Sequence, residues 1–299
     1  MDGFINLLKP PGMSSNDAVG FARRLLPRGT RVGHGGTLDP DAAGVLPVCV
    51  GRAARLFDYI IDKQKTYIAE LRLGIETDTQ DAGGQIVSRH DANAVTGADI
   101  RAVLPRFVGE IDQIPPAYSA IKRDGRRMYD LARRGEAVEL EPRRVSVHSI
   151  EYLRRTGPHS HMLRVSCGKG VYIRTLCHDI GRALGVGGHM AFLLRSEAGA
   201  FHVNDACTLE ELEAASDAGA LDGLLAPMDA LLQQFPALRL DRRFERPVCN
   251  GCPIQPAWHH ARFAAGDVVR IYLEDTFAGM AQADEENTLR FRAMLMERN

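Results

Sequence analysis

The stretch from Val32 to Gly51 constrains this chain more than any other part of its sequence. Three glycines surround His34, and Asp39 stands directly before a proline. Glycine admits backbone conformations that other residues avoid, and a residue before proline is pushed towards extended geometry. The apolar run Gly44–Val50 then predicts a buried strand. Because a polar loop that feeds a buried strand can hold a reactive side chain rigidly, Asp39 is the candidate for chemistry.

The same residues also fit a purely structural interpretation. An Asp followed by Pro is a favourable helix start, with Asp at the N-cap and Pro at the first helical position. Glycine-rich loops are, moreover, commonly plain turns. On the local pattern alone, a helix cap is the simpler interpretation of Asp39.

The whole stretch resembles the signature of the bacterial TruB-type tRNA pseudouridine synthases, enzymes that isomerise the T-loop uridine of tRNA (position 55). The family pattern is G-H-x-G-T-L-D-P-x-A-x-G-V-L-P, and Asp39 matches its catalytic carboxylate. The resemblance implies that His34 helps to fill or hold the place of the extruded base. Gly35 stands where the family usually has Thr, which predicts a looser loop.

Two further segments match the family on either side of this signature. Residues 9–15 match K-P-x-G-x-[ST]-S, which implies a supporting, substrate-side role for Lys9; the alternative is a solvated lysine in a turn. Lys65–Leu73 alternates apolar and polar residues and predicts a strand. The resemblance implies that its Tyr67 stacks on the target base, whereas a tyrosine in a strand is usually half-buried packing.

Residues 168–176 contain the family's K-G-x-Y-I-R core. The resemblance implies that Arg174 pairs with Asp39 and that Lys169 and Tyr172 bind the substrate. The alternative is that Arg174 ends a strand and forms a surface ion pair, worth about 0–1 kcal/mol.

The remaining matching blocks lie on both sides of that core. Residues 113–122 match Q-x-P-P-x-[YF]-S-A-x-K, and residues 187–196 resemble G-x-x-A-x-L-x-R, whose first Leu, Leu193 here, contacts the base in the family. Gly168 and Val171 depart from the family's usual Ser and Thr. These departures bear on the rate more than on the reaction.

Composition sets the class of protein. With 299 residues, 45% hydrophobic and 25% charged, the chain predicts a globular protein with a substantial core. It has no apolar run long enough for a membrane span, and its first residues lack the pattern of a secretory signal. Six scattered cysteines do not suit a disulfide scaffold and indicate a reduced, cytoplasmic protein.

The formal net charge of −1 conceals a segregation of charge. Residues 119–175 contain 13 Lys and Arg against 6 Asp and Glu, whereas residues 196–238 contain 8 acidic residues and no basic ones. Local clusters of Lys and Arg decide phosphate binding, so the middle of the chain can bind a polyanion. Residues 123–135 predict a basic helix with a glycine cap, either as a solvated face or as a phosphate contact.

The resemblance implies an α+β pseudouridine synthase fold, with a large, mostly antiparallel mixed sheet flanked by helices. It places a catalytic domain at residues 1–234 and a small PUA-like β-barrel, an RNA-binding module, at residues 235–299. The implied partner is tRNA, held by its T arm and, through the C-terminal module, by its acceptor end. A monomer is expected. Cys249-x-x-Cys252, with two histidines downstream, resembles half a zinc site; since the family uses no metal, we interpret it as coincidence.

The implied reaction breaks the bond from ribose C1′ to N1 of uracil, turns the base, and rejoins it through C5. It needs neither cofactor nor metal, and a well-held, ionised Asp39 can serve it. We expect Arg174 to orient this carboxylate and to lower its pKa. The sequence leaves open attack at C6, attack at C1′, or a path through a glycal.

Two other function classes make distinct predictions. A non-catalytic RNA-binding or RNA-folding protein on the same fold predicts loss of Asp39, Tyr67 or Arg174, and all three are present. A Ser/His/Asp hydrolase predicts a G-x-S-x-G elbow, which the sequence lacks.

Overall fold

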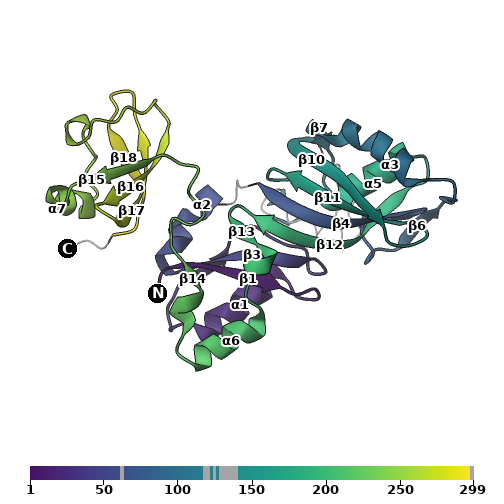
Figure 1. The fold of residues 1–299 in the computed structure, drawn as a ribbon, viewed down its shortest axis with the longest axis horizontal. Coiled ribbons are helices and arrows are strands. Elements are labelled where there is room, and N and C mark those ends of the chain that lie inside the picture. The colour runs from purple at the N-terminus through teal and green to yellow at the C-terminus, as the bar shows by residue number, and fades with distance from the viewer. Residues whose placement is uncertain (61–63, 117–121, 124–125, 128–140, 297–299) are drawn as a thin grey trace.

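A single large sheet forms the body of the molecule (Figure 1). The computed structural model describes residues 1–60, 64–116, 122–123, 126–127 and 141–296. The strands of the large sheet run in the order β14-β1-β3-β12-β4-β11-β10-β7, with β2 paired to β3 and β13 paired to β12. Their bounds are β1 (Gly3–Lys9), β2 (Val32–His34), β3 (Ala43–Val50), β4 (Lys65–Leu73), β7 (Gly109–Gln113), β10 (Arg143–Arg155), β11 (Ser160–Cys167), β12 (Gly188–Ala198), β13 (Phe201–His202) and β14 (Leu225–Ala226).

The pairing of these strands confirms the expected mixed, mostly antiparallel sheet. Only β12 and β3 pair in parallel among the described strands of this sheet, at Leu194 with Ala43 and Arg195 with Gly44. All other described pairs in it are antiparallel. β12 therefore joins a half built on β1 and β3 to a half built on β4, β11 and β10.

Helices cover the sheet in two places (Figure 1). The helix α5 packs with α3 over the β4–β11–β10 half, while α1 and α6 pack together beside β1. The α-helices are α1 (Ser15–Leu25), α2 (Phe57–Ile60), α3 (Gly97–Val103), α5 (Ile173–Ala183), α6 (Leu209–Asp217) and α7 (Glu245–Cys249). The short 3-10 helices are η1 (Gly51–Leu56), η2 (Leu104–Phe107), η3 (Val203–Asp205), η4 (Leu221–Leu224), η5 (Arg242–Phe244) and η6 (Pro256–Trp258).

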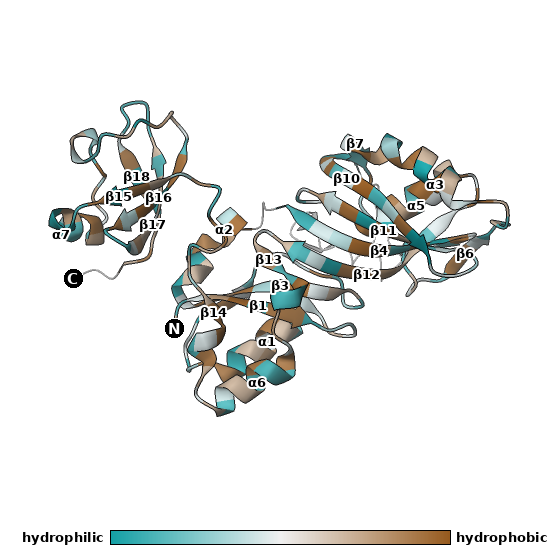
Figure 2. Cartoon of the chain, viewed as in Figure 1, coloured by the Kyte–Doolittle hydropathy of each residue, from teal (hydrophilic) through white to brown (hydrophobic). Residues whose placement is uncertain are grey.

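Local sequence explains where these elements start and which sides they bury. The helices α1, α3 and α6 each begin at a capping box, on Ser14, Thr96 and Thr208 respectively. Figure 2 shows apolar residues along β1 and β3, and seven of the eight residues of β3 are buried. The strand β4, by contrast, alternates along much of its length, because one of its faces packs under α5 and the other is less covered.

A second, smaller sheet lies at the C-terminal end (Figure 1). Its order is β15 (Ala237–Leu240), β16 (Val268–Leu273), β17 (Thr276–Ala283) and β18 (Leu289–Met294). This four-stranded sheet forms the expected C-terminal β-module. In the described residues, an isolated bridge from Ile254 to Leu289 adds to its β18 side. Met280 and Leu295 of this module share an apolar cluster with Phe4 of β1 and Leu56 of η1.

Two short hairpins complete the described elements. They are β5 (Ile75–Thr77) with β6 (Ile86–Arg89), and β8 (Lys122–Arg123) with β9 (Arg126–Arg127). The β8–β9 pair contradicts the start of the basic helix predicted for residues 123–135, because Lys122–Arg123 and Arg126–Arg127 form a two-stranded ladder there. Residues 128–135 of that prediction lie outside the described residues. Among the described helices, none is long and apolar enough to cross a membrane.

Candidate active site

Asp39 lies in a turn and does not cap a helix. The Ala42 amide donates to the Asp39 carbonyl at 3.1 Å, which closes a turn directly before β3. The residue before Asp39 is fixed from α1, where Ser15 Oγ donates to Leu38 O at 3.0 Å and accepts from Leu38 N at 2.8 Å. The structure therefore excludes the helix-cap interpretation. The Asp39 carboxylate lies on a loop that hydrogen bonds hold in place.

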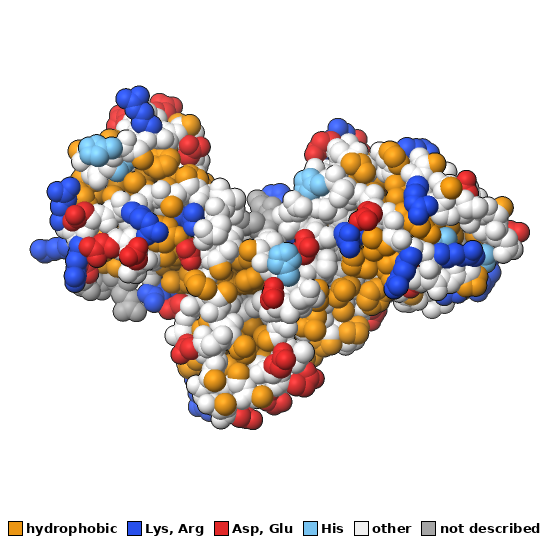
Figure 3. All heavy atoms as spheres, in the orientation of Figure 1, with side chains coloured by type: hydrophobic (Ala, Val, Ile, Leu, Met, Phe, Trp, Pro, Cys, Tyr) orange, Lys and Arg blue, Asp and Glu red, His pale blue; other side chains and the backbone are white. Residues whose placement is uncertain are grey.

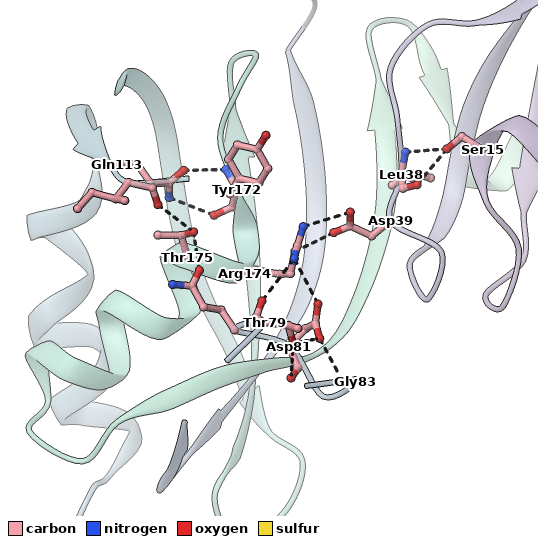
Figure 4. A network of polar contacts seen from close by, with 12 residues as sticks. Ser15, Leu38, Asp39, Thr79, Asp81, Gly83, Gln113, Tyr172, Arg174 and Thr175 are labelled. Atoms are coloured by element: carbon pink, nitrogen blue, oxygen red, sulfur yellow. Dashed lines mark hydrogen bonds and ion pairs between the residues drawn. The ribbon is translucent and has the colours of Figure 1, made fainter. Parts of the chain in front are cut away.

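Asp39 and Arg174 form a two-pronged pair (Figure 4). Arg174 Nε lies 2.9 Å from Asp39 Oδ2, and Arg174 Nη2 donates to Asp39 Oδ1 at 3.3 Å. The Arg174 side chain is 6% exposed and that of Asp39 is 40% exposed. The guanidinium is thus part of the protein interior, whereas the carboxylate reaches the surface of a pocket. The alternative of a solvated surface ion pair does not apply.

Arg174 is itself held from a second side. It lies in the first turn of α5, and its Nη1 donates to Thr79 O at 3.4 Å and lies 3.5 Å from Asp81 Oδ2. Asp81 in turn accepts from Thr79 Oγ1 at 2.6 Å and from the Gly83 amide at 3.1 Å (Figure 4). No role was predicted for Asp81 from the sequence; the available signal was its place at the end of residues 73–81, which resemble the family's second motif.

The pKa of Asp39 departs from the expectation. Burial raises this pKa above its usual value of 3.8, and the nearby charges of Asp81 and Asp41 add to that rise. The positive charge of Arg174 and its hydrogen bond oppose the rise but do not reverse it. Arg174 therefore acts in the predicted direction, while desolvation decides the net effect.

A pocket of about 290 Å³ opens in front of this pair. β4 and β12 contribute Tyr67 and Leu193, whose side chains are largely buried, and the segment before α5 contributes Lys169 and Tyr172. The structure thus brings Asp39 together with most of the other residues predicted for the site. The full lining is Gly36, Thr37, Leu38, Asp39, Lys65, Tyr67, residues 168–174, Leu193 and Arg195.

Lys9 and His34 are not among the residues that line the pocket. Lys9 is 0% exposed, and its Nζ donates to the carbonyls of Pro10, Met13 and Pro40 at 2.7, 2.6 and 3.0 Å. Burial lowers the pKa of Lys9 to about 8. A fully buried side chain matches neither the predicted substrate contact of Lys9 nor a solvated lysine in a turn. The three hydrogen bonds instead join the loop after β1 to Pro40, the residue that follows Asp39.

Two hydrogen bonds between the Gln113 side chain and the Tyr172 backbone also position the site. Gln113 Nε2 donates to Tyr172 O at 3.0 Å, and the Tyr172 amide donates to Gln113 Oε1 at 2.7 Å (Figure 4). These bonds fix the residue that precedes α5, and therefore the direction in which Arg174 leaves the helix. Lys65 and Arg195 also line the pocket and had no predicted role, although Arg195 matches the arginine of the family block at residues 187–196.

The two C-terminal cysteines do not build a site with their neighbours. Cys249 is buried and Cys252 is exposed, while His259 Nδ1 lies 3.1 Å from the carbonyl of Ala261. In the part of the chain that the structure describes, no three His, Cys, Asp or Glu side chains are grouped as metal ligands would be.

Charge is also unevenly placed on the surface (Figure 3). Acidic side chains gather on the lobe that contains α6, and Lys and Arg side chains gather at the outer end of the C-terminal module. There, an open hollow of about 780 Å³ is lined by Arg242, Arg243, Glu245, Arg246 and Asn250.

Comparison with known proteins matches this chain to one family. A model of the TruB family pseudouridylate synthase N-terminal domain matches residues 23–173, and one of the tRNA pseudouridylate synthase B C-terminal domain matches residues 174–233. The tRNA pseudouridine synthase B of Symbiobacterium thermophilum is 47% identical over 253 residues, which cover 84% of this chain and 82% of that protein. The corresponding protein of Pelotomaculum thermopropionicum is 40% identical over 294 residues, covering 96% and 92%.

A solved structure shares the whole architecture. A chain from an H/ACA ribonucleoprotein bound to a substrate RNA containing 2′-deoxyuridine superposes with a TM-score of 0.76 at 26% identity, covering 99% of this chain and 86% of the other. Family models, relatives and fold therefore agree. This chain belongs to the TruB family of pseudouridylate synthases and has the pseudouridine synthase fold.

Proposed function

We propose that this enzyme isomerises the T-loop uridine of tRNA to pseudouridine, with Asp39 as its catalytic carboxylate. One observation carries the proposal: Asp39, oriented by a buried arginine, faces a pocket of about 290 Å³ walled by Tyr67 and Leu193. The substrate assignment is supported by the tRNA pseudouridine synthases B that the chain resembles along most of its length.

The chemistry asks little more than a positioned carboxylate. The C1′–N1 bond breaks, the uracil turns and a C1′–C5 bond forms. C5 then loses its proton and N1 takes up a proton from solvent, so that atoms and oxidation states balance. Asp39 attacks or accepts a proton, and its 40% exposed side chain gives it access to the pocket. Arg174 keeps the carboxylate aimed and offsets part of the cost of its burial.

The pocket also suits a base that has left its stack. A uridine in an RNA loop must be extruded before its C1′–N1 bond can be reached. Tyr67 then offers an aromatic face for stacking, worth about 1–3 kcal/mol per base. Leu193, from the neighbouring strand β12, lines the same pocket and offers an apolar contact to the base.

We further propose that a monomer binds the tRNA by its T arm and acceptor end. Lys169 lies at the pocket and is exposed, so it is placed to meet phosphate beside the target nucleotide. The arginine-lined hollow of the C-terminal module offers a second positive surface for the acceptor end.

The experiment is tritium release from unmodified tRNA labelled at uridine C5, followed by mapping of the modified position. The wild type is compared with Asp39→Asn, which keeps the shape and removes the charge. Asp41→Asn is the matched control, because Asp41 is an exposed carboxylate two residues away that does not line the pocket.

We expect release by the wild type and by Asp41→Asn, mapped to the T-loop uridine, and none by Asp39→Asn. Tight tRNA binding by the wild type without release would leave an RNA-binding protein and end the catalytic proposal. Release mapped to another uridine would overturn the assigned substrate position.

A further inference from the structure

Arg195 occupies the seam between the two halves of the large sheet. It lies on β12 two residues after Leu193, so both side chains face the same side of the sheet. It pairs in parallel with Gly44 of β3 and antiparallel with Tyr67 of β4. Arg195 therefore stands between the strand that follows the Asp39 loop and the strand that carries the stacking tyrosine.

The guanidinium of Arg195 is buried, and each of its three nitrogens donates a hydrogen bond. The residue is 0% exposed, and it forms part of the inner wall of the pocket. Its Nε donates to Val45 O at 2.7 Å, its Nη2 to Gly36 O at 3.1 Å, and its Nη1 to Thr37 O at 3.4 Å. It also lies within electrostatic reach of the Tyr67 phenol.

These contacts need an arginine. The three acceptors are backbone carbonyls from two segments, one on each side of the Asp39 turn. A planar fork can bind both segments at once, whereas a lysine ammonium is a single compact charge. Gly36 has a φ of 119°, in the region that favours glycine, so its carbonyl direction depends on contacts of this kind.

We propose that Arg195 is a positioning residue for pseudouridine formation. By binding the carbonyls of Gly36 and Thr37, it fixes the loop two residues before Asp39, and it does so from the strand that borders Tyr67. It thereby sets the distance between the carboxylate and a base stacked on the tyrosine. This inference rests on the proposed function.

The test separates positioning from binding and from folding. Arg195→Lys and Arg195→Gln are compared with the wild type in single-turnover formation of pseudouridine, in tRNA affinity, and in thermal unfolding. Arg52→Gln is the matched control, because Arg52 also binds a backbone carbonyl, that of Leu295 at 2.7 Å, at the junction with the C-terminal module.

We expect both Arg195 variants to slow the single-turnover step about 100-fold, as displacement of a reacting group by about 1 Å does. Their tRNA dissociation constants should stay within about twofold of the wild type, since affinity comes from phosphate contacts elsewhere. Arg52→Gln should lower the melting temperature and leave the rate of the folded enzyme unchanged. If Arg195→Gln does not fold, Arg195→Lys, which keeps the charge, carries the test.

A wild-type rate in Arg195→Lys would overturn the inference, as would a loss confined to tRNA affinity or to melting temperature. Failure of the proposed function looks different, because the wild type itself would then form no pseudouridine in the T loop.

Discussion

Asp39 and Arg174 are 135 residues apart in the chain, yet Arg174 Nε lies 2.9 Å from the Asp39 carboxylate at the pocket. The pair is asymmetric, because the arginine is enclosed and the carboxylate is partly open. The buried arginine is also held by Asp81 and by the Thr79 carbonyl. Asp39 remains reachable for a substrate.

Replacing Arg174 by lysine tests that arrangement. One ammonium cannot contact both Asp39 oxygens and Asp81 together, so Arg174→Lys should slow single-turnover pseudouridine formation about 100-fold, the size of effect that loss of one oriented donor has elsewhere. Arg164→Lys is the control, because Arg164 forms an exposed ion pair with Glu151 at 2.7 Å. A wild-type rate for Arg174→Lys would show that orientation of Asp39 does not limit catalysis.

The raised pKa of Asp39 predicts an acid limb in the pH–rate profile. The carboxylate form reacts, so the single-turnover rate should fall as pH falls through the pKa of Asp39, and burial places this limb above 3.8. Asp41 contributes to the rise, so Asp41→Asn should move the limb to lower pH. A limb at or below the ordinary aspartate value would show that desolvation does not govern this group.

At the scale of elements, the parallel contact of β3 with β12 is the critical junction. It brings together the loop that carries Asp39 and the strand that carries Leu193 and Arg195. The close approach depends on Gly44, which has a φ of 117°; a Cβ atom there would lie 2.2 Å from the carbonyl oxygen of Arg195. No side chain fits without moving one of the two backbones.

Gly44→Ala should therefore destabilise the protein by at least about 2 kcal/mol, from backbone strain and from loss of the β3–β12 pairing. Chemical denaturation measures the effect. Gly20→Ala in α1 is the matched control, since no atom lies within 4 Å of a Cβ placed there; it should stabilise the helix by about 0.5–1 kcal/mol. Equal stability of Gly44→Ala and the wild type would contradict the close contact.

At the scale of the whole molecule, the C-terminal sheet packs against the half of the large sheet that contains β1 and β3. Arg52 joins Asp2, beside β1, to Leu295, while Tyr272 and Arg270 of β16 both contact Asp229. The apolar cluster that contains Met280 and Leu295 continues beneath these bonds. Polar and apolar contacts therefore both hold the C-terminal sheet against the rest of the protein.

The arginine-lined hollow predicts the salt dependence of tRNA binding. The double variant Arg242→Gln, Arg246→Gln should weaken tRNA affinity and reduce the slope of log K against log salt by about one for each phosphate that the protein no longer neutralises. Arg290→Gln with Arg292→Gln removes the same charge from β18, outside the hollow, and should change both quantities less. Equal effects of the two pairs would show that only the total charge of the module matters.

Much of this molecule could be predicted from short-range patterns. The strand Lys65–Leu73 has the predicted bounds because alternation of burial is a property of neighbouring residues. The helices after Ser14, Thr96 and Thr208 each begin at a capping box, a pattern that is complete within four residues and is therefore visible in the sequence. The family resemblance singled out Asp39, Tyr67, Arg174 and Leu193, and these residues do meet at one pocket.

What only the tertiary structure decided depends on contacts between distant segments. Lys9 turned out to be enclosed by three carbonyls, Asp81 to share Arg174, and burial to outweigh the arginine in setting the pKa of Asp39. Arg195 acquires its three acceptors only when β12 lies beside β3. The sequence by itself determined which residues carry reactive groups and which segments form strands and capped helices, because local geometry and side-chain chemistry suffice for that. Desolvation and the sharing of charges follow from which surfaces are removed from water, and that is decided when the sheet assembles.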